Sequence, residues 1–296
     1  MEKFRSFDEI RKSLEKKETD CKAIVKYYLS NIETKAQLNA FVEVYSQSAL
    51  EQAKAIDEKI ASGKAGKLAG MVIGIKDVLC YNEHESNASS KILEGFESQF
   101  TGTAIQRLID QDAIIIGRLN CDEFGMGSSN ENSVHGKVLN AIDESRVPGG
   151  SSGGSAVAVQ ANLCTVSLGT DTGGSVRQPA KIAYLKETVH SEALQPEIKA
   201  NTLNVLEKLK EEGHEVEEVN FPLLDYVLPT YYILTTAEAS SNLSRFDGVK
   251  YGYRTPNAHN LESMYKLTRS EGFGEEVKRR IMLGTFVLSA SYYDAY

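Results

Sequence analysis

Two glycine turns that carry serine, together with one lysine in an apolar segment, are the residues of this chain whose types could do chemistry. Ser151 and Ser152 stand between two glycine pairs in the run VPGGSSGGSAVAV, and Ser175 ends the turn DTGGS. A serine hydroxyl is a weak nucleophile until a base takes its proton. No histidine lies near either turn, whereas Lys76 lies in the apolar segment VIGIK. The set therefore indicates a hydrolase that attacks amides, with lysine as the base.

Lys76 on its own has a simpler interpretation, as a surface lysine at the end of a strand. Its neighbours Val72, Ile73 and Ile75 are apolar, however, and we expect them to be buried. Burial disfavours the charged form of lysine, so a buried Lys76 would lose its proton more easily than a free lysine. We therefore expect the pKa of Lys76 to be lowered enough for base catalysis.

The glycine-rich turns also have alternative interpretations. A Gly/Ser cluster is commonly a flexible linker, and a glycine loop before a helix can bind phosphate. The flanking sequences VP and AVAVQANLC predict instead that the first cluster opens a packed helix, and the chain lacks the lysine of a Walker loop. In the second turn, Thr172, Gly173 and Gly174 could aim successive backbone N–H groups at one point, which is the geometry of an oxyanion hole. An ordinary glycine turn is the alternative there.

Composition limits the kind of partner and compartment. A net charge of −8 opposes extended contact with nucleic-acid phosphates, so any role with tRNA would need a partner. The four cysteines are widely spaced and show no C-x-x-C pairing, which indicates reduced thiols in a cytoplasmic protein. The five histidines form no pair at ligand spacing, so we expect no metal site. No apolar segment is long enough to span a membrane, and we expect neither export nor membrane insertion.

The hydrophobic pattern predicts an α/β fold. Helical periodicity covers residues 4–33 and 47–60, with Asp20 as a cap for the second helix of the first range. The strands expected at 71–78, 113–119 and 165–172 alternate with a helix at 103–112. The second half continues with a strand at 181–187, a helix at 196–214, a strand at 215–222 and a long helical region. We expect one domain over residues 1–296, with a central mixed β-sheet covered by helices on both faces. Active sites in such folds gather at strand ends, where Lys76 and the turn at 170–175 fall.

The three segments together resemble the amidase signature family, whose catalytic triad is a nucleophilic serine, a serine preceded by a cis peptide bond, and a lysine. The resemblance implies that Ser175 is the nucleophile, Ser151 the relay after a cis bond, and Lys76 the base. The segments SRFDGVKYGYRT and LTRSEGFGEEVKRRIMLGTFVLSASYYDAY are also similar to one branch of that family, the A subunits of bacterial glutamyl-tRNA(Gln) amidotransferases. In that branch a tyrosine and an arginine hold the substrate glutamine. The matching positions are Tyr231 and Arg280, with Tyr232 and Arg279 as adjacent alternatives.

The resemblance to this branch implies a glutaminase that releases ammonia to a partner. The partners would be the B and C subunits, which convert Glu-tRNA(Gln) to Gln-tRNA(Gln) with ATP and magnesium and which make most of the contact with the tRNA. The chain itself would need no cofactor or metal. A free-standing amidase acting on small amides is the alternative within the same chemistry. A scaffold subunit without catalytic activity is the alternative outside it.

The chain also departs from the family pattern at two places. The family continues with several dozen residues after RQPA and with a long segment after YYDAY, so we expect segments to be missing between residues 180 and 181 and after 296. The acidic residue that binds the glutamine amino group in the family would lie in the second of these. If residues are omitted at the first place, the Cα atoms of Ala180 and Lys181 should lie much farther apart than the 3.8 Å of a trans peptide.

Overall fold

The structure is a computed structural model that describes residues 3–172, 175–176, 182–211 and 216–289. The predicted separation of Ala180 and Lys181 concerns residues outside the described part of the chain. The chain divides into two compact units, one formed by residues 1–176 and 242–281 and the other by residues 177–241 and 282–296.

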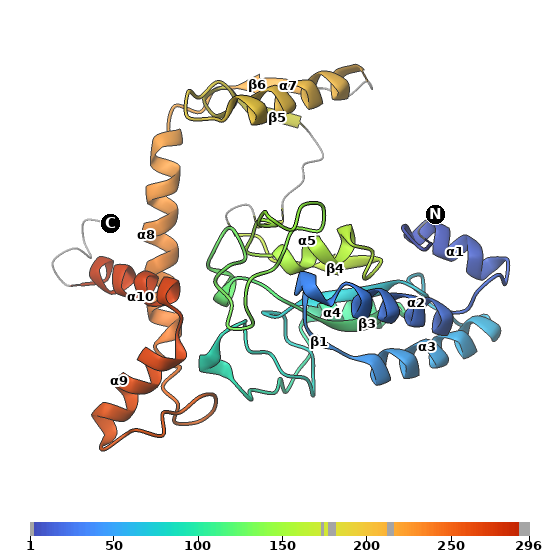
Figure 1. Ribbon diagram of the computed structural model, residues 1–296, viewed down its shortest axis with the longest axis horizontal. Helices are drawn as coiled ribbons and strands as arrows, with labels where there is room; N and C mark the ends of the chain where they lie inside the picture. The colour runs from blue at the N-terminus through green and yellow to red at the C-terminus, as the bar shows by residue number, and fades with distance from the viewer. Residues whose placement is uncertain (1–2, 173–174, 177–181, 212–215, 290–296) are drawn as a thin grey trace. The chain divides into compact units, whose positions relative to one another are not determined.

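A four-stranded mixed sheet forms the centre of the first unit (Figure 1). Its strands are β1 (Phe41–Val44), β2 (Val72–Lys76), β3 (Ile114–Leu119) and β4 (Val166–Leu168), in the order β1-β3-β2-β4. Strands β2, β3 and β4 are parallel, and β1 pairs antiparallel with β3 at the edge. The three parallel strands confirm the sequence prediction, whereas β1 was not predicted, because four residues carry too little alternation to be recognised.

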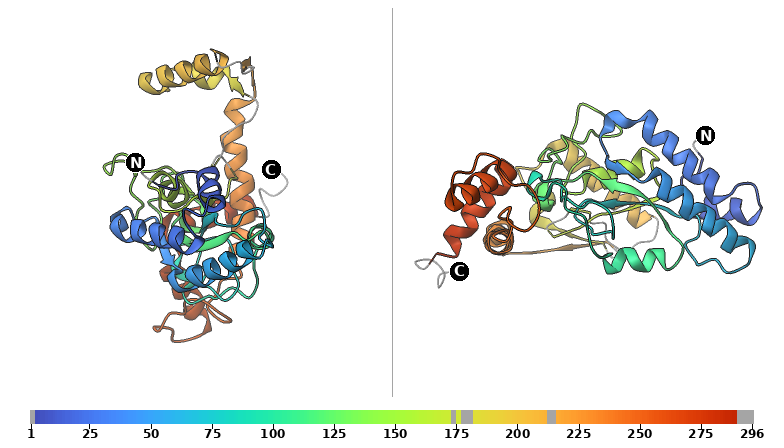
Figure 2. Two further views of the ribbon diagram at one scale, coloured as in Figure 1. Left: turned by 90° about the vertical axis from the view of Figure 1, so that its right-hand side faces the viewer. Right: turned by 90° about the horizontal axis from the view of Figure 1, so that it is seen from below.

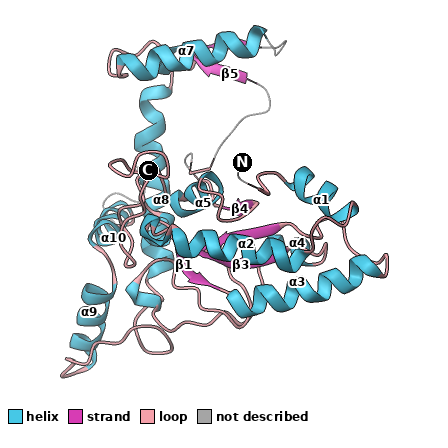
Figure 3. Cartoon of the chain, turned by 45° about the vertical axis from the view of Figure 1, so that its right-hand side comes forward, coloured by secondary structure: helices cyan, strands magenta, loops and turns pink. Residues whose placement is uncertain are grey.

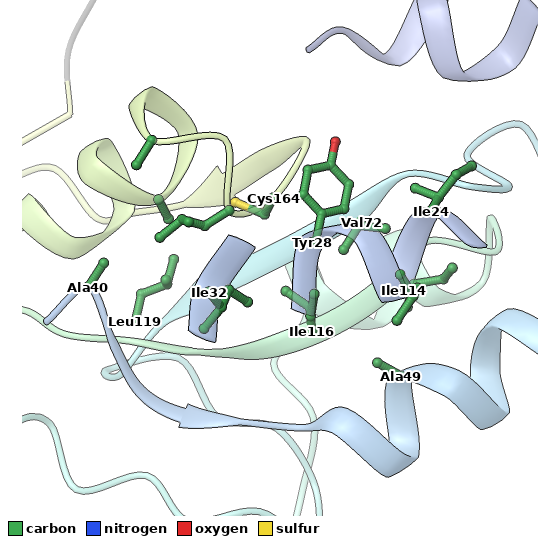
Figure 4. Close-up of a cluster of buried hydrophobic side chains, with 14 of the residues drawn as sticks. Ile24, Tyr28, Ile32, Ala40, Ala49, Val72, Ile114, Ile116, Leu119 and Cys164 are labelled. Carbon is green, nitrogen blue, oxygen red and sulfur yellow. The ribbon is translucent and has the colours of Figure 1, made fainter. Parts of the chain in front are cut away.

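Helices pack on both faces of this sheet, as predicted. Alternate residues of a strand point to opposite faces, and Val72, Ile114 and Ile116 enter one buried cluster while Ile73 and Ile115 enter another. Figure 4 shows the first cluster, in which side chains of the strands meet those of the helices. The first cluster includes residues of α2 (Cys21–Thr34), α3 (Ser46–Ala61) and α5 (Gly153–Gln160), and the second includes residues of α4 (Thr103–Ile109). The fold is therefore a layered α/β fold in which β2, the strand that ends in the lysine, is completely buried.

The helical ranges predicted at the N-terminus are confirmed, and so is the cap predicted at Asp20. After α1 (Phe7–Glu15), the side chain of Asp20 accepts a hydrogen bond from the Ala23 N–H at 2.6 Å and caps α2. Helices α2 and α3 lie side by side in the two views of Figure 2 and again in Figure 3. Helix α3 ends at Ala61 with Ser62 as its C-cap, and Gly63 takes the positive φ that commonly follows a helix.

A third apolar cluster joins the C-terminal helices of the first unit to the segments around residues 88–96 and 124–126. It contains Ile92, Leu243, Phe273 and Val277, with Phe124 packed against it. The elements concerned are the short 3₁₀ helices η2 (Lys91–Leu93) and η3 (Glu123–Gly125), the last residue of α8 (Leu224–Leu243) and α10 (Glu275–Val287), and Phe273 follows directly after α9 (Leu261–Gly272). The cluster therefore fixes the start of α10 against the segment that contains η3.

The second unit is built on two parallel strands and their helices. Strands β5 (Ile182–Leu185) and β6 (Val216–Val219) pair in parallel, and α6 (Lys186–Val189) and α7 (Pro196–Glu211) pack beside them. Helix α8 (Leu224–Leu243) and α10 each contribute residues to both units. Within the second unit the two helices are in contact, and the hydroxyls of Ser240 and Thr285 lie 2.9 Å apart. None of the helices among the described residues has both the length and the apolar character needed to cross a membrane.

Candidate active site

Lys76 is the last residue of β2, and its side chain is fully buried, with no exposed surface. The parallel neighbours β3 and β4 cover both edges of β2, so the lysine leaves the sheet at the carboxyl ends of the strands. Burial lowers the pKa of Lys76, because the charged form loses its water. Cys121, Asp122 and Asp171 act in the opposite direction, with smaller effects. The interpretation of Lys76 as a surface residue is therefore wrong, and the predicted fall in its pKa is confirmed in direction.

Ser151 and Ser152 lie immediately before helix α5, as the flanking sequence predicted. The peptide bond between Gly150 and Ser151 is cis, which confirms the prediction made from the family resemblance. The Ser151 carbonyl accepts a hydrogen bond from the Asp122 N–H at 3.0 Å. Both serines are buried, and the glycines that follow them are buried in the first turn of α5. The run of glycines and serines is therefore part of the packed structure and not a linker.

Three hydroxyl groups surround the Lys76 amine. Its Nζ lies 2.8 Å from the Ser151 Oγ, 2.9 Å from the Ser152 Oγ and 2.8 Å from the Thr170 Oγ1. Ser152 is fixed in turn, because its hydroxyl donates to the Thr170 carbonyl at 3.2 Å and accepts from the Thr170 N–H at 3.3 Å. A neutral amine has two hydrogens and one lone pair. When two of the hydroxyls accept those hydrogens, the lone pair is directed to the third.

Ser175 completes a continuous chain of hydrogen-bonding groups. Its Oγ lies 3.2 Å from the Ser151 Oγ, so Ser151 stands between Ser175 and Lys76. Ser175 is only partly buried, unlike Ser151. Hydroxyl hydrogens can rotate, so the same three groups can carry a proton from Ser175 to Lys76 and back again. The structure thus brings together all three residues predicted as the triad.

Two carboxylates close to the site hold the surrounding backbone. The Asp122 side chain accepts hydrogen bonds from the N–H groups of Asn130 and Asn132, at 2.9 Å and 3.1 Å. A Cβ atom at Gly150 would overlap the Asp122 carboxylate, so glycine is required immediately before Ser151. Asp77 follows Lys76 but is bound elsewhere, because its carboxylate accepts from Arg118 at 2.9 Å. Neither carboxylate makes a hydrogen bond to the triad side chains among the described contacts.

The remaining residues predicted for the site are distributed over the chain. Thr172 is exposed, and its predicted companions in the oxyanion hole, Gly173 and Gly174, lie outside the described residues. Arg280 lies on α10 in the first unit, and its Nε donates to the Glu276 carboxylate at 2.9 Å. Tyr231 lies on α8 in the second unit, in an edge-to-face contact with Tyr232. Within the described part of the chain, no group of three or more histidine, cysteine or acidic residues could hold a metal ion.

Three residues that contact the triad were not predicted as site residues. Ser152 and Thr170 both reach the Lys76 amine, and Gly125 stands opposite it. A Cβ atom at Gly125 would lie 3.6 Å from the Ser151 Oγ and 3.8 Å from the Lys76 Nζ. For Ser152, its position next to Ser151 in the sequence was a signal that it could lie in the site. Thr170 begins the turn at 170–175 that was expected at the site, but nothing singled out its side chain, and Gly125 gave no signal, because only the folded chain places it beside the lysine.

The chain belongs to the amidase family. The sequence profile of that family matches residues 23–183 and 180–296. The A subunit of the glutamyl-tRNA(Gln) amidotransferase from Chlorobium phaeobacteroides, strain DSM 266, is 40% identical, and the alignment covers 99% of this chain and 78% of that protein. It spans 371 positions, although this chain has 296 residues, so the relative carries residues in the aligned region that have no counterpart here.

Solved structures show the same fold. The crystal structure of the glutamyl-tRNA(Gln) amidotransferase A subunit from Thermotoga maritima matches with a TM-score of 0.69 at 28% identity, covering 99% of this chain and 73% of that one. The crystal structure of an amidase matches with a TM-score of 0.79 at 23% identity, covering 98% of this chain and 76% of that one. The second likeness, at this low identity, concerns the fold alone. Together the matches confirm the predicted amidase fold.

Proposed function

We propose that this chain is the glutamine-hydrolysing A subunit of a glutamyl-tRNA(Gln) amidotransferase. The observation that carries the proposal is the continuous path from the Ser175 hydroxyl through Ser151 to a buried lysine of lowered pKa. Such a path supplies a base to a serine nucleophile without histidine. The 40% identity, over nearly the whole chain, to the Chlorobium protein selects glutamine as the amide among the substrates of the family.

The reaction follows from the order of the three side chains. Ser175 attacks the side-chain amide carbon of glutamine, its proton passes to Ser151, and the Ser151 proton passes to neutral Lys76. The proton then returns from Lys76 through Ser151 to the amide nitrogen, the C–N bond breaks, and ammonia leaves a γ-glutamyl ester on Ser175. Water attacks this ester while the relay takes one of its protons, the relay returns that proton to the Ser175 oxygen as the ester C–O bond breaks, and glutamate is released. Backbone N–H groups between Thr172 and Ser175 would stabilise the negative oxygen formed in each step.

The substrate and partners complete the proposal. The Arg280 guanidinium can pair with the glutamine α-carboxylate through two parallel hydrogen bonds, and Tyr231 would contact the same substrate. The B and C subunits would take the ammonia, and the partner that activates Glu-tRNA(Gln) would use ATP and magnesium. The tRNA would be bound mainly by these partners, since this chain carries a net charge of −8. The complex would act in the cytoplasm, where the tRNA is used.

The second proposal concerns the domain. The family profile matches in two stretches that meet at residues 180–183, and the relative has additional residues in the aligned region. The second unit exposes large apolar side chains of α8, among them Val227, Leu228 and Leu234. We infer that both units belong to one amidase domain that lacks an internal segment at this junction. The mass of the protein isolated from its natural source, compared with the mass of this sequence, tests this inference.

Replacement of Ser175 by alanine tests the proposed function. In the complex with the B and C subunits, Ser175→Ala should abolish glutamine hydrolysis while amidation of Glu-tRNA(Gln) with added ammonium chloride continues, because the nucleophile only makes ammonia. Retained hydrolysis would remove Ser175 as the nucleophile. Loss of the ammonia-dependent reaction in an intact complex would show that the division of labour is wrong.

The double variant tests the shared relay. Residues that act as a unit show losses that are not additive. Lys76→Ala together with Ser175→Ala should therefore lose no more activity than Ser175→Ala alone. Ser155→Ala is a matched control, since Ser155 is a buried serine of α5 that donates to the Leu168 carbonyl and does not contact Lys76. Single losses that multiply in the double variant would contradict a common proton path.

A further inference from the structure

Glu123 is a buried carboxylate that the proposed reaction does not use. It belongs to η3 and has 5% of its surface exposed. Both carboxylate oxygens accept from the Gly274 N–H, at 2.9 Å and 3.1 Å, and the Ser90 hydroxyl donates to one of them. The partners come from segments far apart in the sequence. Glu123 is therefore a bridge between η3, the segment at Ser90 and the residue that precedes α10.

One end of this bridge reaches the catalytic residues. Gly125, two residues after Glu123, has a positive φ of 70°, a conformation that favours glycine. A Cβ atom at this position would lie 3.6 Å from the Ser151 Oγ and 3.8 Å from the Lys76 Nζ, so the glycine faces both side chains. A shift of Glu123 would move this turn, because the Gly125 N–H bonds to the Asp122 carbonyl within the same segment. The position of η3 thus determines the space opposite the triad.

The other end of the bridge reaches the helix that carries Arg280. Gly274 immediately precedes α10, so Glu123 accepts a free N–H at the start of that helix, where a negative charge is favourable. A Cβ atom at Gly274 would overlap the Glu123 carboxylate, so the approach depends on glycine there. Glu276 lies in the first turn of the same helix, and its carboxylate accepts a hydrogen bond from Arg280 and so orients the guanidinium. The Arg280 side chain is 11% exposed.

We propose that Glu123 is a positioning residue for substrate binding, which holds the Arg280 helix in register with the glycine turn opposite Ser151 and Lys76. This inference rests on the proposed function, in which Arg280 binds the glutamine α-carboxylate. Glu123 itself contacts no substrate. It sets the separation between the group that binds the carboxylate end of glutamine and the groups that attack its amide end.

Steady-state kinetics of the assembled amidotransferase, measured as glutamine hydrolysis, tests the inference. Glu123→Ala should raise KM for glutamine about tenfold and change kcat less than about threefold, because the carboxylate acts on binding and not on proton transfer. Glu123→Gln keeps the shape but loses the charge, and should raise KM by a smaller factor. Glu275→Gln is the matched control. Glu275 is an exposed glutamate at the start of the same helix that pairs with Lys278, and its variant should keep the KM of the unmodified chain.

Arg280→Ala and the double variant Glu123→Ala/Arg280→Ala identify the route of the effect. If Glu123 acts through Arg280, the double variant has the same KM as Arg280→Ala alone. If the factors by which the two single variants raise KM multiply in the double variant, the inference is overturned and the role of Arg280 stays intact. An Arg280→Ala variant with unchanged KM would overturn both the inference and the proposed carboxylate site. In Glu123→Gln, kcat could instead fall by the same factor by which KM rises. That result would show that Glu123 only supports the fold of the triad, and it would also overturn the inference.

Discussion

Ser152→Ala removes one of the three hydroxyls around Lys76, the proposed base, while leaving the three residues of the proposed triad in place. The Ser152 Oγ lies 2.9 Å from the Lys76 Nζ, and Lys76 gains a positive charge when it takes the relayed proton. A hydrogen bond to a charged group contributes about 1.5–3 kcal/mol. If that contribution is lost in the transition state, kcat/KM for glutamine falls about 10- to 100-fold.

The same substitution changes the pH dependence in a defined direction. Lys76 is the base only when neutral, so kcat/KM rises with pH through its pKa in the free enzyme. The Ser152 hydroxyl stabilises the ammonium form more than the neutral amine, because the ammonium is the stronger donor. Without the Ser152 hydroxyl, the pKa of Lys76 falls further. The rise of kcat/KM with pH therefore moves to lower pH, while the plateau value of kcat/KM is lower than in the unmodified chain.

The assay is glutamate formation by the complex over a range of pH, with Ser155→Ala as the control. The control should retain the activity and profile of the unmodified chain, because the Ser155 hydroxyl bonds to the Leu168 carbonyl and not to the lysine. Two results would show that Ser152 does not stabilise the charged lysine. One is a Ser152→Ala variant as active as the control, and the other is an acid limb that moves to higher pH.

Two further predictions concern stability. Folding lowers the pKa of Lys76, so the unfolded chain binds more protons between the folded and unfolded pKa values, and stability rises with pH there. Lys76→Met removes this dependence on pH. In urea titrations, the unfolding free energy of the variant relative to the unmodified chain should therefore decrease as the pH rises toward 10.5, the ordinary pKa of lysine, and a constant difference would contradict the lowered pKa. Gly150→Ala should reduce the unfolding free energy by about 1–3 kcal/mol, since its Cβ overlaps the Asp122 carboxylate. Gly149→Ala is the control, because a Cβ atom there would meet no atom within 4 Å. It should reduce the unfolding free energy by only about 1 kcal/mol, because of the positive φ of this residue. Equal losses of unfolding free energy in the two variants would be evidence against the overlap at Gly150.

The elements that carry the triad were predictable because each had a strong local signal. The continuous apolar run before Lys76 indicates a buried parallel strand. The small and apolar residues after Ser152 indicate a packed helix, and Asp20 has the side chain that caps a helix. Edge strand β1 was not predicted, because its existence depends on pairing with β3 and not on its own sequence.

The surroundings of the triad could not be derived from the sequence. The hydroxyl of Thr170 reaches Lys76 only because β4 pairs in parallel with β2 and both strands end at the same edge of the sheet. Glu123 meets Gly274 across 151 positions of sequence, and no local pattern encodes that contact. The roles of Ser151 and Ser175 as relay and nucleophile came from the family resemblance, because both serines lie in similar glycine turns.

Trapping of the acyl-enzyme distinguishes Ser175, the proposed nucleophile, from the other serines of the site. The complex is mixed with glutamine, quenched in acid during turnover, digested and analysed by mass spectrometry. We expect a γ-glutamyl ester on the peptide that contains Ser175, and no adduct in the Ser175→Ala variant. An adduct on Ser151 or Ser152 would rule out Ser175 as the nucleophile, as would steady glutamate formation with no ester on this chain.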